Sequence, residues 1–344
     1  MAHSEWTKTD TVGLLQAIAE QPYQFDFFQA LRRLEGLYTD KPRIGESVRP
    51  QDDPIRLGQE PSLAFSPSTL ASLRQREQGL APRLAVFFFG LFGPNGPLPL
   101  HLTEYARNRI RNHDDETLAR FADIFHHRLL SLFYRAWANA QPTVSFDRPN
   151  KDRFGEYIGA TLGIGAPALR NRDAAPDLAK LYYAGLFANQ TRHADGLRAL
   201  IADYFGMPVA VDQFVGHWLE LSPDTMTKLG DSPATGALGL TAVIGSRVWD
   251  CQHKFRIVIG PIGYQDYRRL LPGGDSLKRL VALVRNYQDD SLSWTLKLIL
   301  KKQEVPPLQL GQAGELGWTT WSTTRELEHD ADDLELDAIR YAAY

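Results

Sequence analysis

The densest run of apolar residues in the chain leads directly into a proline-rich turn. The run at 86–89, Val-Phe-Phe-Phe, predicts a strand, and Gly-Pro-Asn-Gly-Pro follows it at 93–97. Polarity then alternates over 98–102, and Thr103 is a suitable N-cap for a short helix over 103–112. A loop that carries leucines is either a buried crossing or a docking surface. We favour docking, because prolines reduce the entropy that a loop loses on binding.

Elsewhere, apolar residues recur every three or four positions, which predicts amphipathic helices. The first spans 11–37 and should break at Pro22, because proline lacks the N–H that a helix interior needs. A longer helix is capped by Asp114 or Asp115 and stops before Pro142. Further helices are expected over 154–162, 191–206 and 275–284.

Short β-rich runs lie between these helices. They cover 55–57, 63–65, 209–211, 218–219, 240–249, 255–259, 294–300 and 317–321. The runs at 240–249 and 255–259 are expected to form a hairpin around residues 250–253. Helices and strands mix along the chain without a long-period repeat, so we predict an α+β fold with short antiparallel sheets.

The chain is expected to divide into two halves and a tail. Residues 141–180 carry Pro, Gly, Arg and Asp at the density of a loop, which favours an N-terminal half of 1–140 and a C-terminal half of 141–322. Residues 323–344 are rich in Asp and Glu, and we expect this acidic tail to be solvated and flexible.

A Gly-Pro-x-Gly motif occurs twice, at 93–96 and at 260–263. With 27 Gly and 21 Pro in 344 residues, chance predicts only about 0.1 occurrences. Each copy follows an apolar run and precedes a capped helix. The repetition predicts that each half of the fold projects an equivalent Gly-Pro loop.

The long central helix carries a wide apolar stripe. Its members are Leu118, Phe121, Ile124, Phe125, Leu129, Leu132, Phe133 and Trp137. Large side chains along a wide stripe usually pack inside the fold, so burial in the chain's own core is the favoured interpretation. Contact with a helix bundle of another chain is the alternative.

Composition limits the classes of partner. The net charge of −3 does not favour nucleic acid, and Cys251, the only cysteine, allows no internal disulfide. The longest apolar run, residues 84–92, is too short to span a membrane, and no secretory signal is visible at the N-terminus. We therefore expect a cytoplasmic protein with no direct membrane insertion.

Candidate chemistry is sparse. Asp123, His126 and His127 share one helix, but the two histidines diverge around its axis, so at most two ligands would converge on a metal. His101 and Glu104 resemble an acid/base pair without a nucleophile. No nucleotide-binding or hydrolase motif occurs. We expect no catalytic residue, no metal site and no cofactor.

Several blocks carry a specific resemblance. They are Phe27–Glu35, Phe87–Tyr105, Asp123–Trp137, Gly245–Asp250, Lys254–Arg256, Gly260–Pro261 and Leu271–Gly274. Through them the chain resembles the TssG family, also called ImpH or VasB, which consists of baseplate subunits of type VI secretion systems. The resemblance runs from about residue 25 to about residue 321.

The resemblance implies a structural, non-enzymatic protein similar to a wedge protein of contractile phage baseplates. Members of the family form a complex with two copies of TssF and with TssE, and they bind TssK trimers that connect to the membrane complex. A cytoplasmic, membrane-proximal location follows. A wedge protein of another contractile injection system or of a phage tail is the alternative, and a metal-dependent or acid/base enzyme is a third, less favoured interpretation.

The family is described as contacting TssK through two projecting loops, which implies a first loop at 92–102 and a second loop at 261–274. The first-loop contact residues are Phe92, Gly93, Pro94, Asn95, Gly96, Pro97, Leu98, Pro99 and Leu100. The second-loop residues are Pro261, Ile262, Gly263, Tyr264, Tyr267, Leu270, Leu271 and Pro272. For the helix bundle with TssF, the candidates are Phe121, Phe125, Leu129, Leu132, Phe133 and Trp137. Two loops would let one chain hold two TssK trimers.

Overall fold

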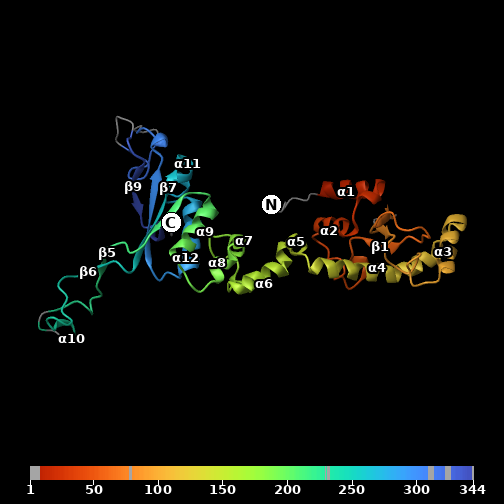
Figure 1. The fold of residues 1–344 in the computed structure, drawn as a ribbon, viewed down its shortest axis with the longest axis horizontal. Helices are drawn as coiled ribbons and strands as arrows, with labels where there is room; N and C mark the ends of the chain where they lie inside the picture. Colours follow the sequence, from red (N-terminus) through yellow and green to blue (C-terminus); the bar gives the residue numbers. More distant parts are fainter. Residues whose placement is uncertain are drawn as a thin grey trace. The chain divides into compact units, whose positions relative to one another are not determined.

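The computed structural model describes residues 8–76, 80–228, 230, 233–308, 314–321 and 327–342. The chain forms two compact units, Met1–Glu156 and Tyr157–Tyr344. Helices and small sheets mix in it (Figure 1), as the α+β prediction requires. No helix within the described ranges is both long enough and apolar enough to cross a membrane.

The first unit is built around a three-stranded sheet and the long helix α4. The strands β1 (Arg56–Gln59), β2 (Leu70–Arg74) and β3 (Arg83–Val86) have the order β1-β3-β2. The β1–β3 pair is parallel, so the sheet is not purely antiparallel as expected. The helices are α1 (Lys8–Glu20), α2 (Phe27–Leu37), α3 (Leu100–His113), α4 (Thr117–Asn139) and α5 (Pro142–Phe146). Single 3₁₀ turns are η1 (Pro22–Gln24), η2 (Pro50–Asp52) and η3 (Pro149–Lys151).

The break predicted at Pro22 is confirmed. Helix α1 ends at Glu20, and α2 begins after Asp26, whose carboxylate accepts hydrogen bonds from the backbone N–H groups of Phe28 and Gln29. This N-cap satisfies donors that the first helical turn leaves free. The core of the unit includes Ile18, Leu31, Leu34, Leu57, Leu84, Leu130 and Tyr134, all at most 2% exposed.

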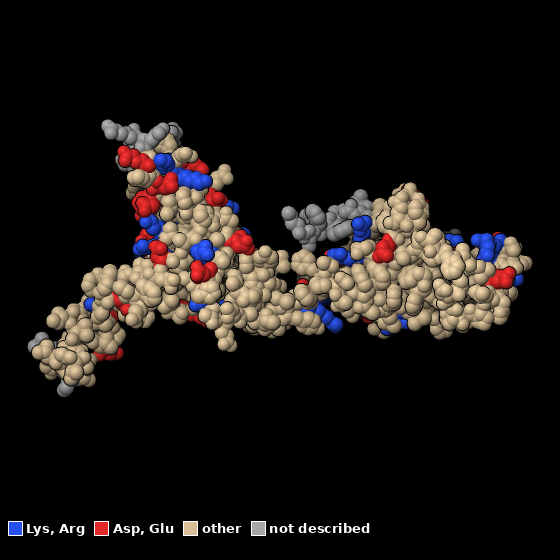
Figure 2. All heavy atoms as spheres, viewed as in Figure 1, with Lys and Arg blue, Asp and Glu red and all other residues tan. Residues whose placement is uncertain are grey.

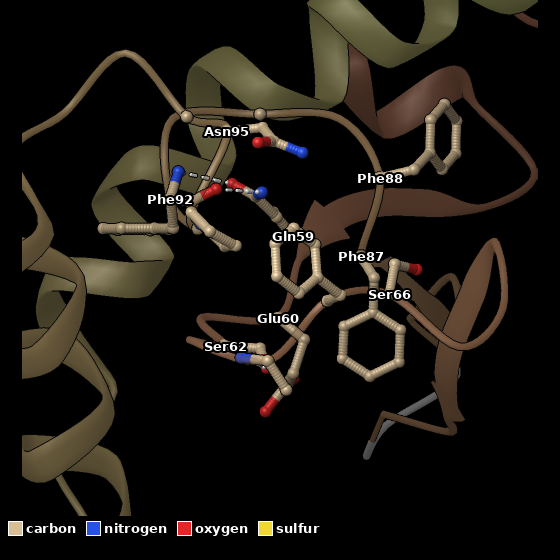
Figure 3. Close-up of a pocket in the computed structure, with 14 residues that line it drawn as sticks. Gln59, Glu60, Ser62, Ser66, Phe87, Phe88, Phe92 and Asn95 are labelled. Carbon is tan, nitrogen blue, oxygen red and sulfur yellow. Dashed lines mark hydrogen bonds between the residues drawn. The ribbon is translucent and has the colours of Figure 1, made fainter.

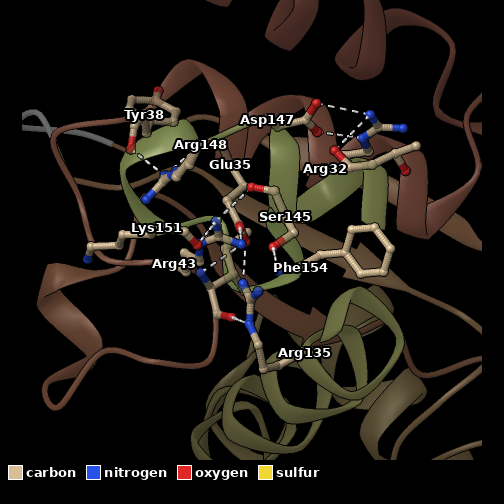
Figure 4. A network of polar contacts seen from close by, with 12 residues as sticks. Arg32, Glu35, Tyr38, Arg43, Arg135, Ser145, Asp147, Arg148, Lys151 and Phe154 are labelled. Carbon is tan, nitrogen blue, oxygen red and sulfur yellow. Dashed lines mark hydrogen bonds and ion pairs between the residues drawn. The ribbon is translucent and has the colours of Figure 1, made fainter. Parts of the chain in front are cut away.

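Arginine side chains fasten residues 142–151 to the first unit (Figure 4). The Arg32 guanidinium donates to Asp147 at 2.6 Å, and Arg43 donates to the carbonyl oxygens of Ser145 and Lys151. Arg148 in turn donates to carbonyl oxygens of the 35–41 segment. The unit therefore extends to Glu156, whereas the sequence placed its end at residue 140. The composition of residues 141–180 indicated a loop. The contacts that hold residues 142–151 in the first unit join residues about 100 positions apart, so local composition could not reveal them.

The second unit is built around a four-stranded sheet. Its strands are β4 (Val209–Asp212), β7 (Lys254–Ile262), β8 (Ser293–Leu300) and β9 (Ala331–Leu336), in the order β4-β7-β8-β9. The β7–β8 pair is parallel and the other two are antiparallel. Two amphipathic helices, α9 (Ala194–Phe205) and α12 (Asp275–Gln288), bury their leucines in the core that this sheet shares. Gly206 ends α9 in the left-handed region at φ 65°, as predicted.

The remaining elements of the chain are short. They are α6 (Arg153–Thr161), η4 (Pro167–Leu169), α7 (Asp177–Tyr182), α8 (Ala184–Ala188), β5 (His217–Glu220), α10 (Pro233–Gly236), β6 (Arg247–Asp250), α11 (Tyr264–Arg269), η5 (Lys302–Glu304) and α13 (Ala338–Ala342). Residues 63–65 and 317–321, expected as strands, form none.

The predicted hairpin at 240–259 is wrong. Strand β6 pairs with β5, with Trp218 opposite Trp249, whereas β7 pairs with β4 and β8. Of the two runs, the first is a strand only at its end, in β6, and the second lies within β7, and the partners of both strands lie elsewhere in the sequence. Pairing is non-local, so the turn-like residues 250–253 were not sufficient to specify it.

The acidic tail contributes an edge strand instead of a flexible segment. Strand β9 pairs with β8, and Leu336 is 3% exposed. Its carboxylates pair across the sheet, Glu335 with Arg256 at 2.9 Å and Asp332 with Lys297 at 2.8 Å. Alternation of acidic and apolar residues is the pattern of a half-buried strand. Residues 323–326 of the predicted tail lie outside the described residues.

Candidate docking surfaces

Helix α4 turns its large apolar residues outward. Phe121, Ile124 and Phe125 are 60%, 66% and 52% exposed, and Leu129, Leu132 and Phe133 are 39–44% exposed. We call these six residues the α4 apolar face. Its spacing of three and four residues forms one continuous stripe along the helix. Burial in the chain's own core, which the sequence favoured, is therefore wrong for this face.

The inner face of α4 carries small and polar residues instead. The buried positions include Ala119, Ala122, His126, His127, Leu130, Ser131, Tyr134 and Ala138. Strand β1 approaches this face so closely that a Cβ on Gly58 would lie 2.6 Å from the carboxylate of Asp123. Close packing at this point favours the side of α4 that carries small and polar residues, while Leu130 and Tyr134 enter the core farther along the helix. Leu118 and Trp137, the remaining stripe residues, are half-buried, and Trp137 packs on Phe28.

Both histidines of α4 are structural. His127 accepts the backbone N–H of Leu57 at 3.1 Å through Nδ1, and its Nε2 lies 2.9 Å from Asp53. His126 accepts the backbone N–H of Leu91 at 2.9 Å through Nε2, and its Nδ1 lies 3.3 Å from Asp123. A metal would need ring lone pairs that these N–H groups already occupy. The described residues contain no cluster of three or more metal-ligating side chains.

Asp123 lies at the junction of β1, β3 and α4. It accepts the backbone N–H of Gln59 at 3.1 Å and pairs with Arg83 at 2.8 Å. Burial opposes its ionisation, but the hydrogen bond with His126 and the charge of Arg83 together hold the pKa of Asp123 below its usual value. The ionised carboxylate therefore stabilises the packing of α4 on the sheet.

Asp123→Asn should destabilise the chain most near neutral pH. The pKa of Asp123 is lower in the folded chain than in the unfolded chain. The ionised carboxylate therefore stabilises the fold at any pH above the unfolded-state pKa, and this stabilisation is lost as the pH falls through the folded-state pKa. In urea titrations, the difference in midpoint between wild type and variant should shrink below about pH 4. A difference that stays constant with pH would contradict this assignment.

Side chains from three elements hold the first loop, and Figure 3 shows one of them, Gln59, against Phe92. Three consecutive backbone N–H groups, of Leu91, Phe92 and Gly93, donate to His126 on α4, Gln59 on β1 and Thr103 on α3. The Gln59 amide also donates to the Phe92 carbonyl oxygen at 2.7 Å, so it pairs with that residue's backbone as a neighbouring strand would. The loop is therefore fixed before any partner binds.

Glycine is required where this loop leaves the sheet. Gly90 has φ 148°, and a Cβ there would lie 2.2 Å from the Gln59 side-chain oxygen. Any other residue would displace the amide that holds Phe92. The loop conformation thus depends on the close approach of the Gly90 backbone to the Gln59 side chain, and Gly90 lies outside the Gly-Pro motif.

Only part of the first loop faces solvent. Phe92 is 3% exposed and Leu98 is half-buried, whereas Leu100 is 56% exposed and begins helix α3. The helix starts before the expected Thr103, which is buried and holds Gly93 instead of capping. The exposed loop residues are Pro94, Asn95, Pro97, Pro99 and Leu100.

The second loop is not equivalent to the first. Pro261 and Ile262 belong to β7, and Tyr264 begins helix α11. Tyr267, Leu270 and Leu271 are at most 4% exposed in the core of the second unit. Their predicted role as exposed anchors is therefore wrong. The same four-residue motif forms a turn at 93–96 and ends a strand at 260–263.

A different segment of the second unit presents apolar residues. The ribbon formed by β5 and β6, with α10 beyond it, projects from the sheet; we call residues 213–253 the arm (Figure 1). Leu238, Leu240 and Ile244 are 94%, 88% and 99% exposed. Figure 2 shows few charged side chains on the arm, in contrast to the region around β9. The sequence prediction interpreted 240–249 as a strand, although Gly239 and Gly245 adopt positive φ there and interrupt extension.

The remaining candidates for catalysis, His101, Glu104 and Cys251, do not form a catalytic arrangement among the described residues. His101 and Glu104 are exposed on α3, and neither side chain makes a hydrogen bond or ion pair within the described part of the chain. Cys251 is half-buried in the turn between β6 and β7. The arrangement as a whole offers apolar surfaces and a fixed loop, which suit protein docking.

Comparisons with known proteins found a matching family model and similar solved structures. The family model described as "Type VI secretion, TssG" matches residues 21–323. A chain in a solved baseplate complex from the type VI secretion system is similar with a TM-score of 0.68 and 23% identity, covering 96% of this chain and 94% of that one. A chain in a TssK-TssF-TssG baseplate subcomplex, solved by cryo-electron microscopy, has a TM-score of 0.47 and 23% identity, covering 56% and 80%. No curated protein matches the sequence.

Proposed function

Because residues 21–323 match its model, the chain belongs to the TssG family of type VI secretion, and we propose that it is a structural baseplate subunit that assembles with TssF and TssK. Its fold resembles a chain of a solved baseplate complex over nearly its whole length. The match to a type VI family favours this role over a wedge protein of another contractile system. The proposal rests above all on the exposed α4 apolar face.

The α4 apolar face is the proposed contact with TssF. Six large apolar side chains in one stripe form a surface of the kind that marks a protein interface. Residues spaced by three and four positions fit the groove between helices of a partner bundle. Full burial of each such side chain contributes about 1.5–3 kcal/mol. Because these side chains are already about half buried in the free chain, binding gains about half of that for each of them.

The first loop and the arm are the proposed contacts with TssK. The loop is fixed by Gln59, His126 and Thr103, so it loses little entropy on binding. The arm takes the place of the second loop, whose anchors are buried. Once one of these two contacts has formed, the other binds at a high effective concentration, because both belong to the same chain. The contact with TssE, the second copy of TssF and the cytoplasmic location are proposed from the family resemblance.

The experiment that tests the proposal is co-expression with TssF and TssK from the same cell. We expect a complex of all three to co-elute on size-exclusion chromatography, and mass photometry gives the copy numbers. A folded chain that elutes alone in the presence of both partners would overturn the proposed function.

Leu240→Asp together with Ile244→Asp should weaken TssK binding at least about tenfold and leave TssF binding unchanged. Both side chains are almost fully exposed, at 88% and 99%, so the melting temperature should not change. Ile339→Asp on α13 is the matched control, since that side chain is 44% exposed outside the arm. Wild-type TssK affinity in the double variant would exclude the arm as a contact.

A further inference from the structure

An arginine-lined hollow lies beside the α4 apolar face. Its volume is about 490 Å³, and Leu57, Asp123, Ile124 and His127 form part of its lining. The arginines that line it come from all three strands and from α4: Arg56, Arg74, Arg76, Arg83 and Arg120. A hollow with this many guanidinium groups is a recognition site for carboxylates or phosphates, because each group presents paired donors in a planar fork.

The guanidinium groups outnumber the carboxylates that neutralise them. Asp123 pairs with Arg83 at 2.8 Å, and Glu116 pairs with Arg74 at 3.0 Å. Arg120 shares both of these carboxylates. The nearby carboxylate of Asp53 is occupied by His127 at 2.9 Å.

Two of the arginines do not take part in these pairs. Within the described residues, the side chains of Arg56 and Arg76 make no hydrogen bond or ion pair. Arg56 is half-buried on β1, and Arg76 is exposed just beyond β2. Counted over the described residues, the hollow therefore holds excess positive charge. Arg56 is partly shielded from water, where an ion pair is stronger than at an open surface.

The hollow and the apolar face are continuous. Ile124 is a member of the face and also lines the hollow. A helix that covers the face therefore passes the mouth of the hollow, and one of its side chains can enter. An apolar neighbour favours a protein ligand, because nucleic acid or free phosphate would leave Ile124 and Phe121 in water.

We propose that the TssF segment which covers the α4 apolar face inserts an Asp or Glu side chain into this hollow and pairs with Arg56 and Arg76. The inference rests on the proposed function, since it names a specificity contact of the same interface. A partner helix can slide along a uniform apolar stripe with little change in binding free energy. A charge pair opposes such sliding, because every shifted position separates the two charges. The carboxylate would set the position of TssF along α4.

Charge reversal tests the pairing. Arg56→Glu combined with Arg76→Glu should weaken binding of purified TssF at least about tenfold at low salt and remove most of the salt dependence of the affinity. Arg111→Glu combined with Arg172→Glu is the matched control, because both side chains are exposed outside the hollow and the net charge changes equally. Circular dichroism and the melting temperature establish that each variant is folded.

The outcomes separate this inference from the function on which it rests. If charge reversal leaves TssF affinity and its salt dependence unchanged while Phe125→Asp abolishes binding, the hollow has no role and the α4 contact stands. If neither variant affects binding, the α4 contact itself is wrong.

A chemical cross-link identifies the carboxylate directly. Arg56→Lys in the purified complex places an amine at the hollow, and a carbodiimide joins an amine only to a carboxylate in contact with it. We expect mass spectrometry to find residue 56 joined to an Asp or Glu of TssF. Cross-links confined to Asp53, Glu116 or Asp123 of the same chain would overturn the proposal.

Discussion

Phe125→Asp combined with Leu132→Asp should abolish TssF binding and leave the chain folded. The two side chains are 52% and 43% exposed, so the isolated chain loses little packing when they are replaced. Because each side chain is already about half buried in the free chain, each replacement removes about 0.8–1.5 kcal/mol of further apolar burial in the complex. A carboxylate facing an apolar partner adds a desolvation cost. The sum exceeds about 4 kcal/mol, which corresponds to a loss of affinity of about a thousandfold.

Isothermal titration of purified TssF measures that loss, and thermal unfolding checks the fold. Tyr23→Asp provides the control: Tyr23 is 64% exposed in η1, outside the α4 apolar face, and its replacement should leave TssF affinity unchanged. The same double variant should keep its affinity for TssK, because the first loop and the arm are intact. A folded double variant that binds TssF as the wild type does would remove the basis of the proposed contact.

Gln59→Leu should both destabilise the first unit and weaken TssK binding. The substitution leaves the buried N–H and carbonyl groups of Phe92 without partners, and each unsatisfied group costs about 1–3 kcal/mol. The midpoint of urea unfolding should fall accordingly. The first loop would also become mobile, so it would lose more entropy when TssK binds.

Glu60→Leu is the control for that substitution. Glu60 is the next residue along the chain and, like Gln59, lines a cavity beside the first loop (Figure 3), but its side chain makes no hydrogen bond within the described residues. We expect it to keep both the unfolding midpoint and the TssK affinity of the wild type. If Gln59→Leu loses stability but binds TssK normally, the loop is not a docking element and Gln59 serves the fold alone.

Local features of the fold were predictable from the sequence. Pro22 breaks a helix because of its own covalent structure, and Gly206 ends one because it reaches positive φ without strain. Periodicity located α4 and α12 for the same reason: an amphipathic stripe is a property of a single segment.

Features that depend on distant residues were not predictable. Periodicity showed that α4 has an apolar stripe but not which side faces the sheet, since that is decided by the close approach of Gly58. The partner of β6 and the pairing of β9 depend on segments far away in sequence. The side chain of Gln59, which holds the first loop, lies 33 residues before Phe92 and belongs to no motif.

The Gly-Pro repetition misled for a related reason. A tetrapeptide specifies which backbone angles are allowed, and both Gly93 and Gly260 indeed adopt positive φ. Whether such a residue forms a turn or ends a strand depends on the neighbouring chain, which is α3 in one case and β8 in the other. Sequence similarity between two short motifs therefore did not predict similar exposure.

Phe125 and His126 are neighbours on α4 that point in different directions, one toward solvent and the other toward the first loop. A rotation of the helix about its axis that improves one contact must disturb the other. Over evolutionary time, a substitution that adjusts α4 to a changed TssF would also move the acceptor of the Leu91 N–H. The surfaces that we propose for two different partners cannot change independently, so we expect TssF and TssK to coevolve through this single helix.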